Sequence, residues 1–161
     1  MWTLIIVSHF LMFISFSMLL FSAITGHFLI DDLDTLSLKY FSIYAIIVYV
    51  FTQSLILFLI ITINKNIKNL VIENSLKIED QLYSKYKFKM HMHTSLNLLF
   101  MTIIAILYGA VHTGLMSELI HNIIFCIILS HYLYNIIIQY KCFKRIIKLI
   151  VRVNDMIVSK L

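Results

Sequence analysis

The sequence contains no proline and only 3 glycines, so little in it interrupts a helix. Proline removes a backbone donor and glycine costs conformational entropy, and their scarcity therefore favours long unbroken helices. Charged residues are also scarce, at 13% against roughly a quarter in a typical soluble domain. Because 61% of the residues are hydrophobic, the chain has too little polar surface to cover a globule in water. We therefore expect its apolar surface to face a lipid bilayer.

Motifs of known chemistry are missing as well. The two cysteines, Cys126 and Cys142, are too far apart to pair on one straight helix, at about 24 Å by helical rise, and no CxxC occurs. Neither a Gly-rich phosphate loop nor a Ser-His-Asp order is present. We therefore expect a subunit of a membrane complex rather than a self-contained enzyme. Nucleic acid is not an expected partner, because the basic residues flank apolar runs as membrane topology requires.

Four apolar runs are long enough to cross a bilayer. They predict an all-α bundle of four transmembrane helices, forming one integral membrane domain over residues 1–161. The expected spans are 3–28, 40–63, 94–116 and 119–140. The first run is longer than the apolar core of a signal peptide, so it is expected to be a retained membrane helix.

Basic residues gather in two segments. Six of the 13 lie in 64–90 and six in 141–161. With four spans both segments fall on one side, and the positive-inside rule then places both termini and the 64–90 loop in the cytoplasm or a matrix. A bacterial inner membrane or an organellar inner membrane fits this topology. Apolar residues in 141–161 follow helical spacing, which predicts an amphipathic basic helix, either interfacial or continuous with the fourth span.

Two parts of the chain look alike. Segments 8–27 and 92–112 both begin with a residue followed by histidine and end with glycine near histidine. The second member of each pair runs from an uncharged span into a basic tail. Two tandem helical hairpins, related by a pseudo-twofold axis along the membrane normal, are therefore a further hypothesis.

Histidines occur in layers along these spans. His9 and His93 lie near the expected cytoplasmic boundary, and His131 lies near the middle of its span. The group near the outer boundary comprises His27, His112 and His121. Imidazoles within apolar runs are costly, so these six are candidate cofactor ligands.

Haem ligation is the leading interpretation of these layers. A membrane b-type haem needs two imidazoles at matched depth on neighbouring helices. His9 and His27 are five helical turns apart, about 27 Å, and so share one face of the first helix. The matched depths predict His9 opposite His93 in an inner site, and His27 opposite His112 or His121 in an outer site.

A family resemblance points the same way. Thr25-Gly26-His27 ends one span, and a later span reads IHNIIFCIILSHYLYNIIIQYK, with spaced histidines before a basic turn. This pattern resembles the helical hairpins of small membrane b-type cytochromes, over roughly 8–27 and 92–144. The second span departs from the pattern because it has no histidine. The resemblance implies haem b as a cofactor and electron transport within a membrane redox complex.

Other functions fit the same residues. One is a non-catalytic structural or assembly subunit of a larger membrane complex, without a cofactor. Another is a small transporter or pore, with Gln53 and His131 along its path. A third is an outer-face metal site of nitrogen and oxygen ligands, centred on His27, His112 and His121.

Uncharged polar residues in the spans are expected to join helices. His131 is expected to bond to Thr52 or Gln53 across the bundle, unless it acts as a ligand or in a proton relay. The same interhelical role is expected for Asn97, Asn135 and Gln139. Aromatic residues at positions suited to interfacial belts are Trp2, Tyr40, Tyr44, Tyr132, Tyr134 and Tyr140.

Overall fold

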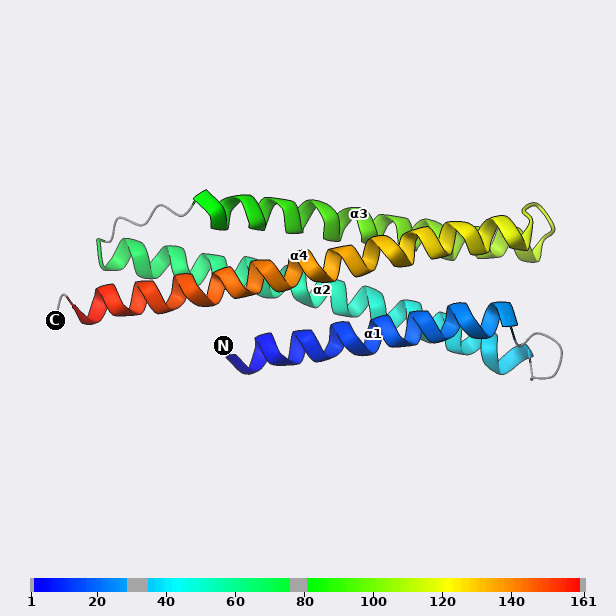
Figure 1. Ribbon diagram of the computed structural model, residues 1–161, viewed down its shortest axis with the longest axis horizontal. Helices are drawn as coiled ribbons and strands as arrows, with labels where there is room; N and C mark the ends of the chain where they lie inside the picture. Colours follow the sequence, from blue (N-terminus) through cyan, green and yellow to red (C-terminus); the bar gives the residue numbers. More distant parts are fainter. Residues whose placement is uncertain (1, 29–34, 76–80, 160–161) are drawn as a thin grey trace.

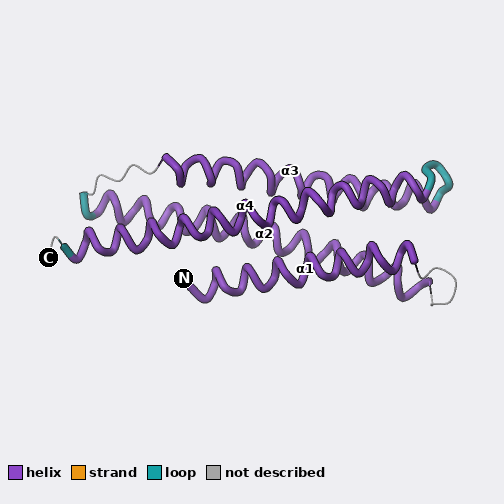
Figure 2. The backbone as a smooth tube through the Cα atoms, in the orientation of Figure 1, coloured by secondary structure: helices purple, strands orange, loops and turns teal. Residues whose placement is uncertain are grey.

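The computed structural model is a bundle of four long helices (Figure 1). They are α1 (Trp2–Phe28), α2 (Thr35–Glu73), α3 (Gln81–His112) and α4 (Glu118–Val158). The structure describes residues 2–28, 35–75 and 81–159, and within these ranges it contains helices and turns but no strand (Figure 2). All four helices are long and apolar enough to span a membrane. The predicted all-α bundle of four transmembrane helices is therefore confirmed, and its architecture is that of an integral membrane protein.

The helices pack as two hairpins. α1 contacts chiefly α2, and α3 contacts chiefly α4. The hairpins meet where α1 touches α4 and where α2 touches α3, and α2 also reaches α4 across the middle of the bundle. The described parts of α1 and α3 do not touch, so these two helices occupy opposite corners. Residues on α1 and α3 are thus separated by the α2–α4 contact.

The helices α2, α3 and α4 extend beyond the N-terminal end of α1 (Figure 1). α4 has 41 residues and α1 has 27, which correspond to about 61 Å and about 40 Å of helical rise. The N-terminus of α1 lies well inside the long axis of the molecule, and α2, α3 and α4 continue past it (Figure 1). Because a hydrocarbon core is about 30 Å thick, the excess length of α4 projects beyond it. The segment from 141 is thus continuous with the fourth span, one of the two forms predicted for it.

Apolar side chains line both the interior and the outside of the bundle. Many large ones are exposed, among them Phe10, Phe13, Phe51, Phe58 and Ile106, as expected where the surrounding solvent is lipid. Two interior clusters hold the helices together. One surrounds Leu19, Ala45 and Met101. The other surrounds Met12, Ile60, Met90 and Phe143 and continues into the three-helix part.

The turn between α3 and α4 is closed by backbone hydrogen bonds. The amide of Leu115 donates to the carbonyl of Ala110 at 2.9 Å, and that of Gly114 donates to the carbonyl of Val111 at 3.0 Å. This pair of bonds is a Schellman motif, which requires a left-handed residue at its centre. Gly114 takes that conformation, with φ of 74°. The tight turn sets α4 antiparallel to α3.

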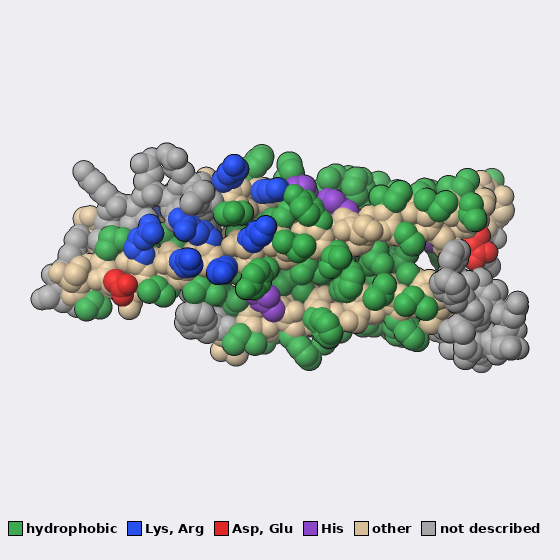
Figure 3. Space-filling model, in the orientation of Figure 1, with side chains coloured by type: hydrophobic (Ala, Val, Ile, Leu, Met, Phe, Trp, Pro, Cys, Tyr) green, Lys and Arg blue, Asp and Glu red, His purple; other side chains and the backbone are tan. Residues whose placement is uncertain are grey.

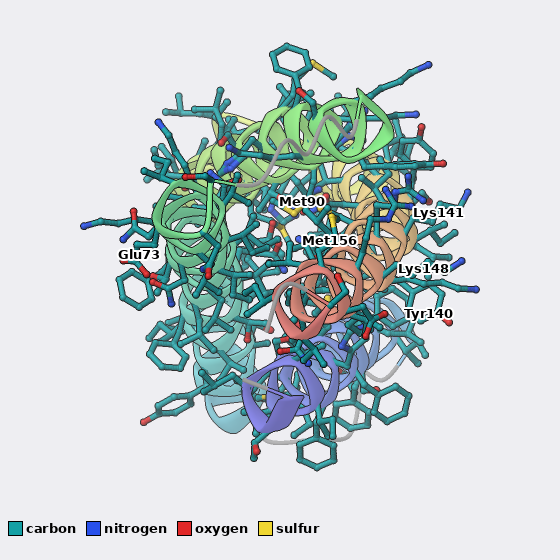
Figure 4. All side chains as sticks on the ribbon, turned by 90° about the vertical axis from the view of Figure 1, so that its left-hand side faces the viewer. Glu73, Met90, Tyr140, Lys141, Lys148 and Met156 are labelled. Carbon is teal, nitrogen blue, oxygen red and sulfur yellow. The ribbon has the colours of Figure 1, made fainter. Side chains whose placement is uncertain are left out.

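Basic side chains gather at the end of the bundle where the C-terminus lies (Figure 3). We define this cationic end by the described basic residues Lys65, Lys68, Lys85, Lys87, Lys89, Lys141, Lys144, Arg145, Lys148 and Arg152. Viewed from that end, Lys141 and Lys148 point away from the bundle, whereas Met90 lies between the helices (Figure 4). The charged side chains therefore lie on the outside of an apolar three-helix core.

Candidate functional site

Uncharged polar side chains from all four helices meet between the two apolar clusters. We call them the polar core: Ser15, Tyr49, Gln53, Thr94, Asn97, Tyr132, Asn135 and Gln139, all with 0% exposure. An unpaired polar group inside a membrane protein costs several kcal/mol, because no water is available to bond it. The position of these groups therefore depends on the hydrogen bonds that they make with one another.

Gln53 of α2 lies at the centre of these bonds. Its Oε1 accepts from Asn135 Nδ2 at 3.3 Å and from Gln139 Nε2 at 2.7 Å. Thr94 of α3 closes the ring, since its hydroxyl accepts from Gln139 Nε2 at 3.0 Å and donates to Asn135 Oδ1 at 3.2 Å. One closed ring of four side chains thus joins α2, α3 and α4.

Tyr132 connects this ring to α1. Its hydroxyl accepts from Gln53 Nε2 at 3.2 Å and lies 2.6 Å from the hydroxyl of Ser15. The ring of Tyr132 packs edge-on against Tyr49, with centroids 4.8 Å apart and planes at 88°. All four helices are therefore linked at one level through one tyrosine.

A second chain of bonds leads from the interior to the surface. The hydroxyl of Tyr49 donates to Asn97 Oδ1. Asn97 Nδ2 lies 2.9 Å from His131 Nδ1, and His131 Nε2 lies 3.3 Å from His93 Nδ1. Both histidines are only partly buried, so this chain ends on the outer side of α3 and α4.

The orientation of the Asn97 side-chain amide determines which group donates in each of these hydrogen bonds. Asn97 Nδ2 also faces the carbonyl oxygen of Ile128 at 3.4 Å, so the nitrogen of that amide must point toward α4. His131 Nδ1 is then an acceptor, and its proton lies on Nε2, where it donates to His93 Nδ1. His93 in turn carries its proton on Nε2. Every donor along the chain therefore points outward.

The surroundings of the two imidazoles are aromatic and cationic. Tyr134 packs edge-on against His93, with centroids 5.2 Å apart. Lys89, one turn before His93 on α3, places its Nζ 5.3 Å from the centroid of the Tyr134 ring. We call Lys89, His93, His131 and Tyr134 the histidine cluster.

His9 and His93 do not face each other, contrary to the prediction. His93 bonds to His131, and the helices of His9 and His93 occupy opposite corners. His9 instead packs against Tyr140 and Phe143 of α4, with centroids 5.8 and 5.3 Å away. Its Nδ1 lies 2.7 Å from the carbonyl oxygen of Ile5, to which it donates. His9 Nε2 is buried and has no hydrogen-bond partner among the described residues.

The outer histidines are only partly described. The His121 ring lies 5.8 Å from that of Tyr108, and its buried Nε2 also has no partner in the described chain. The side chains of His27 and His112 fall outside the described part of the structure. Among the described residues, which exclude those two side chains, no three potential metal ligands lie together. The outer-face metal site thus stays a prediction.

Two expectations about polar side chains need correction. His131 bonds to α3 rather than to Gln53 or Thr52 of α2, and Thr52 bonds to the carbonyl of Val48 in its own helix. Tyr132 is fully buried in the polar core and does not belong to an interfacial belt. Tyr132 lies nine residues from the nearest lysine, Lys141, and this distance from the basic segment indicates a position inside the span rather than at its boundary. The interhelical role predicted for Asn97, Asn135 and Gln139 is confirmed.

A shallow groove runs along the outer face of α4. Its volume is about 300 Å³, and its lining residues are Leu119, Asn122, Ile123, Cys126, Ile127 and Ser130. Ser130 lies one helical turn before Tyr134 on the same side of α4. The groove therefore ends beside the histidine cluster.

No protein-family model matches the chain, and no curated protein or solved structure matches it either.

Proposed function

We propose that this chain is a non-catalytic structural or assembly subunit of a larger membrane protein complex. The observation that carries the proposal is the closed interior. The side chains of the polar core bond chiefly to one another, although the buried Gln139 Oε1 has no partner among the described residues. They lie between two apolar clusters whose central side chains are almost fully buried. A protein built in this way acts through its outer surface.

This geometry disfavours a pore along the bundle axis. Ions or protons crossing a membrane need polar groups or water along the path. Here the bonds of the polar core run sideways, from Tyr49 toward His93, and apolar side chains fill the axis on both sides. The described interior therefore lacks a continuous polar route.

A stripe on α2 is suited to contact a neighbouring helix. Tyr44, Phe51 and Phe58 are spaced by seven residues and are 62%, 61% and 64% exposed. A seven-residue repeat keeps side chains on one helical face, and aromatic residues are enriched at protein interfaces. We infer that this aromatic stripe contacts the partner subunit.

Site-specific photo-crosslinking in native membranes tests the proposal. A benzoylphenylalanine at Phe51 or Phe58 is expected to yield one discrete protein adduct. Ile106 and Ile127, which are 70% and 63% exposed on α3 and α4, provide matched control positions. Equal adducts at all four positions, or none at any, would contradict the assignment of the stripe. Ion or proton flux through purified protein in liposomes would contradict the subunit role.

Haem binding is the second candidate, and one observation favours it. An imidazole that ligates iron donates its other ring N–H to a carbonyl or similar acceptor. His9 has this arrangement, with Nδ1 bonded to Ile5 and a buried Nε2 that lacks a partner among the described residues. His121 Nε2 is also buried and lacks a partner in the described chain. The optical spectrum of purified protein, with a pyridine-haemochrome assay, tests this prediction, and the absence of a Soret band would remove it.

A further inference from the structure

The histidine cluster presents hydrogen-bond donors to the lipid-facing side of α3 and α4. The chain of bonds leaves the proton of His93 on Nε2, and no described residue accepts it. The ammonium of Lys89 lies one turn away, beside the same tyrosine ring. A neutral N–H donor and a cation therefore share one patch of surface.

These donors favour a ligand with a negative charge. A metal cation would need the lone pair of His93 Nδ1, which already accepts from His131, and would be repelled by Lys89. A phosphate oxygen would accept from both His93 Nε2 and Lys89, in charge-assisted bonds that exceed neutral ones in strength. The chemistry of the patch therefore fits an anionic phosphate.

The position of the cluster indicates which phosphate is available. Lys85, Lys87 and Lys89 begin the cationic end on α3, and the apolar part of that helix follows them. His93 thus lies just inside the hydrocarbon boundary, where phospholipid headgroups end. The acyl chains of a lipid at this boundary reach only the middle of the bilayer, so they pass the near end of the α4 groove at Ser130, whereas its far end at Leu119 lies beside the turn at the opposite boundary.

We propose that the histidine cluster binds the phosphate of an anionic phospholipid in the leaflet at the cationic end. His93 Nε2 and the ammonium of Lys89 donate to the phosphate oxygens. Asn97 and His131 act as positioning residues, because they hold the His93 ring with its proton outward.

Native mass spectrometry of the full chain, released from detergent with added phosphatidylglycerol or phosphatidylcholine, measures this binding. Phosphatidylglycerol is expected to give one tight adduct that phosphatidylcholine does not. Lys89→Gln is expected to weaken it about fivefold, the effect of one lysine near an anionic lipid surface. His93→Leu should weaken it to a similar extent, and Lys89→Arg should retain it. Lys148→Gln removes the same charge from an exposed site elsewhere on the cationic end and is the matched control.

Glycerol phosphate, which carries the headgroup phosphate without acyl chains, tests the source of the phosphate separately. It should bind much more weakly than phosphatidylglycerol, because the cluster faces the lipid-exposed side of α3 and α4. Binding of glycerol phosphate as tightly as the lipid would overturn the lipid assignment. An equal loss in Lys148→Gln would show diffuse attraction to the cationic end, and an unchanged adduct in Lys89→Gln would refute the site. Lys89 lies outside the core, so the Gln and Arg variants decide the matter even if His93→Leu does not fold.

Discussion

Replacing Gln53 by leucine is the most direct test of the polar core. Gln53 makes three hydrogen bonds to another helix, with Tyr132, Asn135 and Gln139. Leucine has a similar size but cannot bond to any of them. The substitution therefore removes the centre of the network while keeping the interior filled.

The size of the effect follows from the number of bonds. An interhelical hydrogen bond inside a membrane protein contributes about 0.6 kcal/mol on average. Losing three of them predicts a decrease of about 2 kcal/mol in the free energy of unfolding. Thr52→Val is the matched control, because Thr52 is equally buried but bonds only to the carbonyl of Val48 in its own helix. This control should change stability by no more than about 0.5 kcal/mol.

Unfolding in mixed micelles, with helix content followed by circular dichroism, measures both variants. A loss in Gln53→Leu that is no larger than that in Thr52→Val would refute the argument that the network stabilises the bundle. The double variant Gln53→Leu with Gln139→Leu adds a second check. Its destabilisation should be less than the sum of the single effects, because the two side chains share one bond.

Two further predictions concern the backbone and the thiols. Gly114→Ala should destabilise the chain by about 1 kcal/mol in the same unfolding assay, because alanine is strained at positive φ. Gly109→Ala, inside α3 with open space around its Cβ, should be neutral or stabilising, and a loss there equal to that in Gly114→Ala would contradict the backbone explanation. Cys126 faces lipid inside the fourth span and Cys142 is buried between the helices, so intact-mass analysis after treatment of the protein in liposomes with a water-soluble maleimide should show no adduct. An adduct at Cys142 would show that the α4 interface opens.

The sequence predicts the helices well because their determinants are local. Run length, the absence of proline and the scarcity of charge are sufficient for four spans. The interhelical role of the amides could also be predicted, because an amide in an apolar run must find a partner. Which partner it finds depends on helix rotation and register, and these are properties of the assembled bundle.

His131 illustrates this limit. His131, Asn135 and Gln139 are spaced by four residues and look like one face of a helix. Each step of four residues nevertheless turns the side chain by about 40°, because a turn has 3.6 residues. Over eight residues the direction changes by about 80°. His131 consequently bonds to α3, whereas Gln139 bonds to Thr94 of α3 and also reaches Gln53 of α2.

The histidines also differ in whether a ring nitrogen keeps a lone pair that no neighbouring group uses. Matching depths alone made all six equivalent as candidate ligands, but a ligand must also offer a free lone pair. His93 and His131 use their lone pairs within one outward chain of bonds, so they are suited to donate to an anion at the surface. His9 donates to its own helix, and the lone pair on its Nε2 has no partner in the described chain, so it is suited to accept. Among the candidate ligands whose side chains are described, any haem would therefore have to engage His9 or His121 rather than His93 and His131.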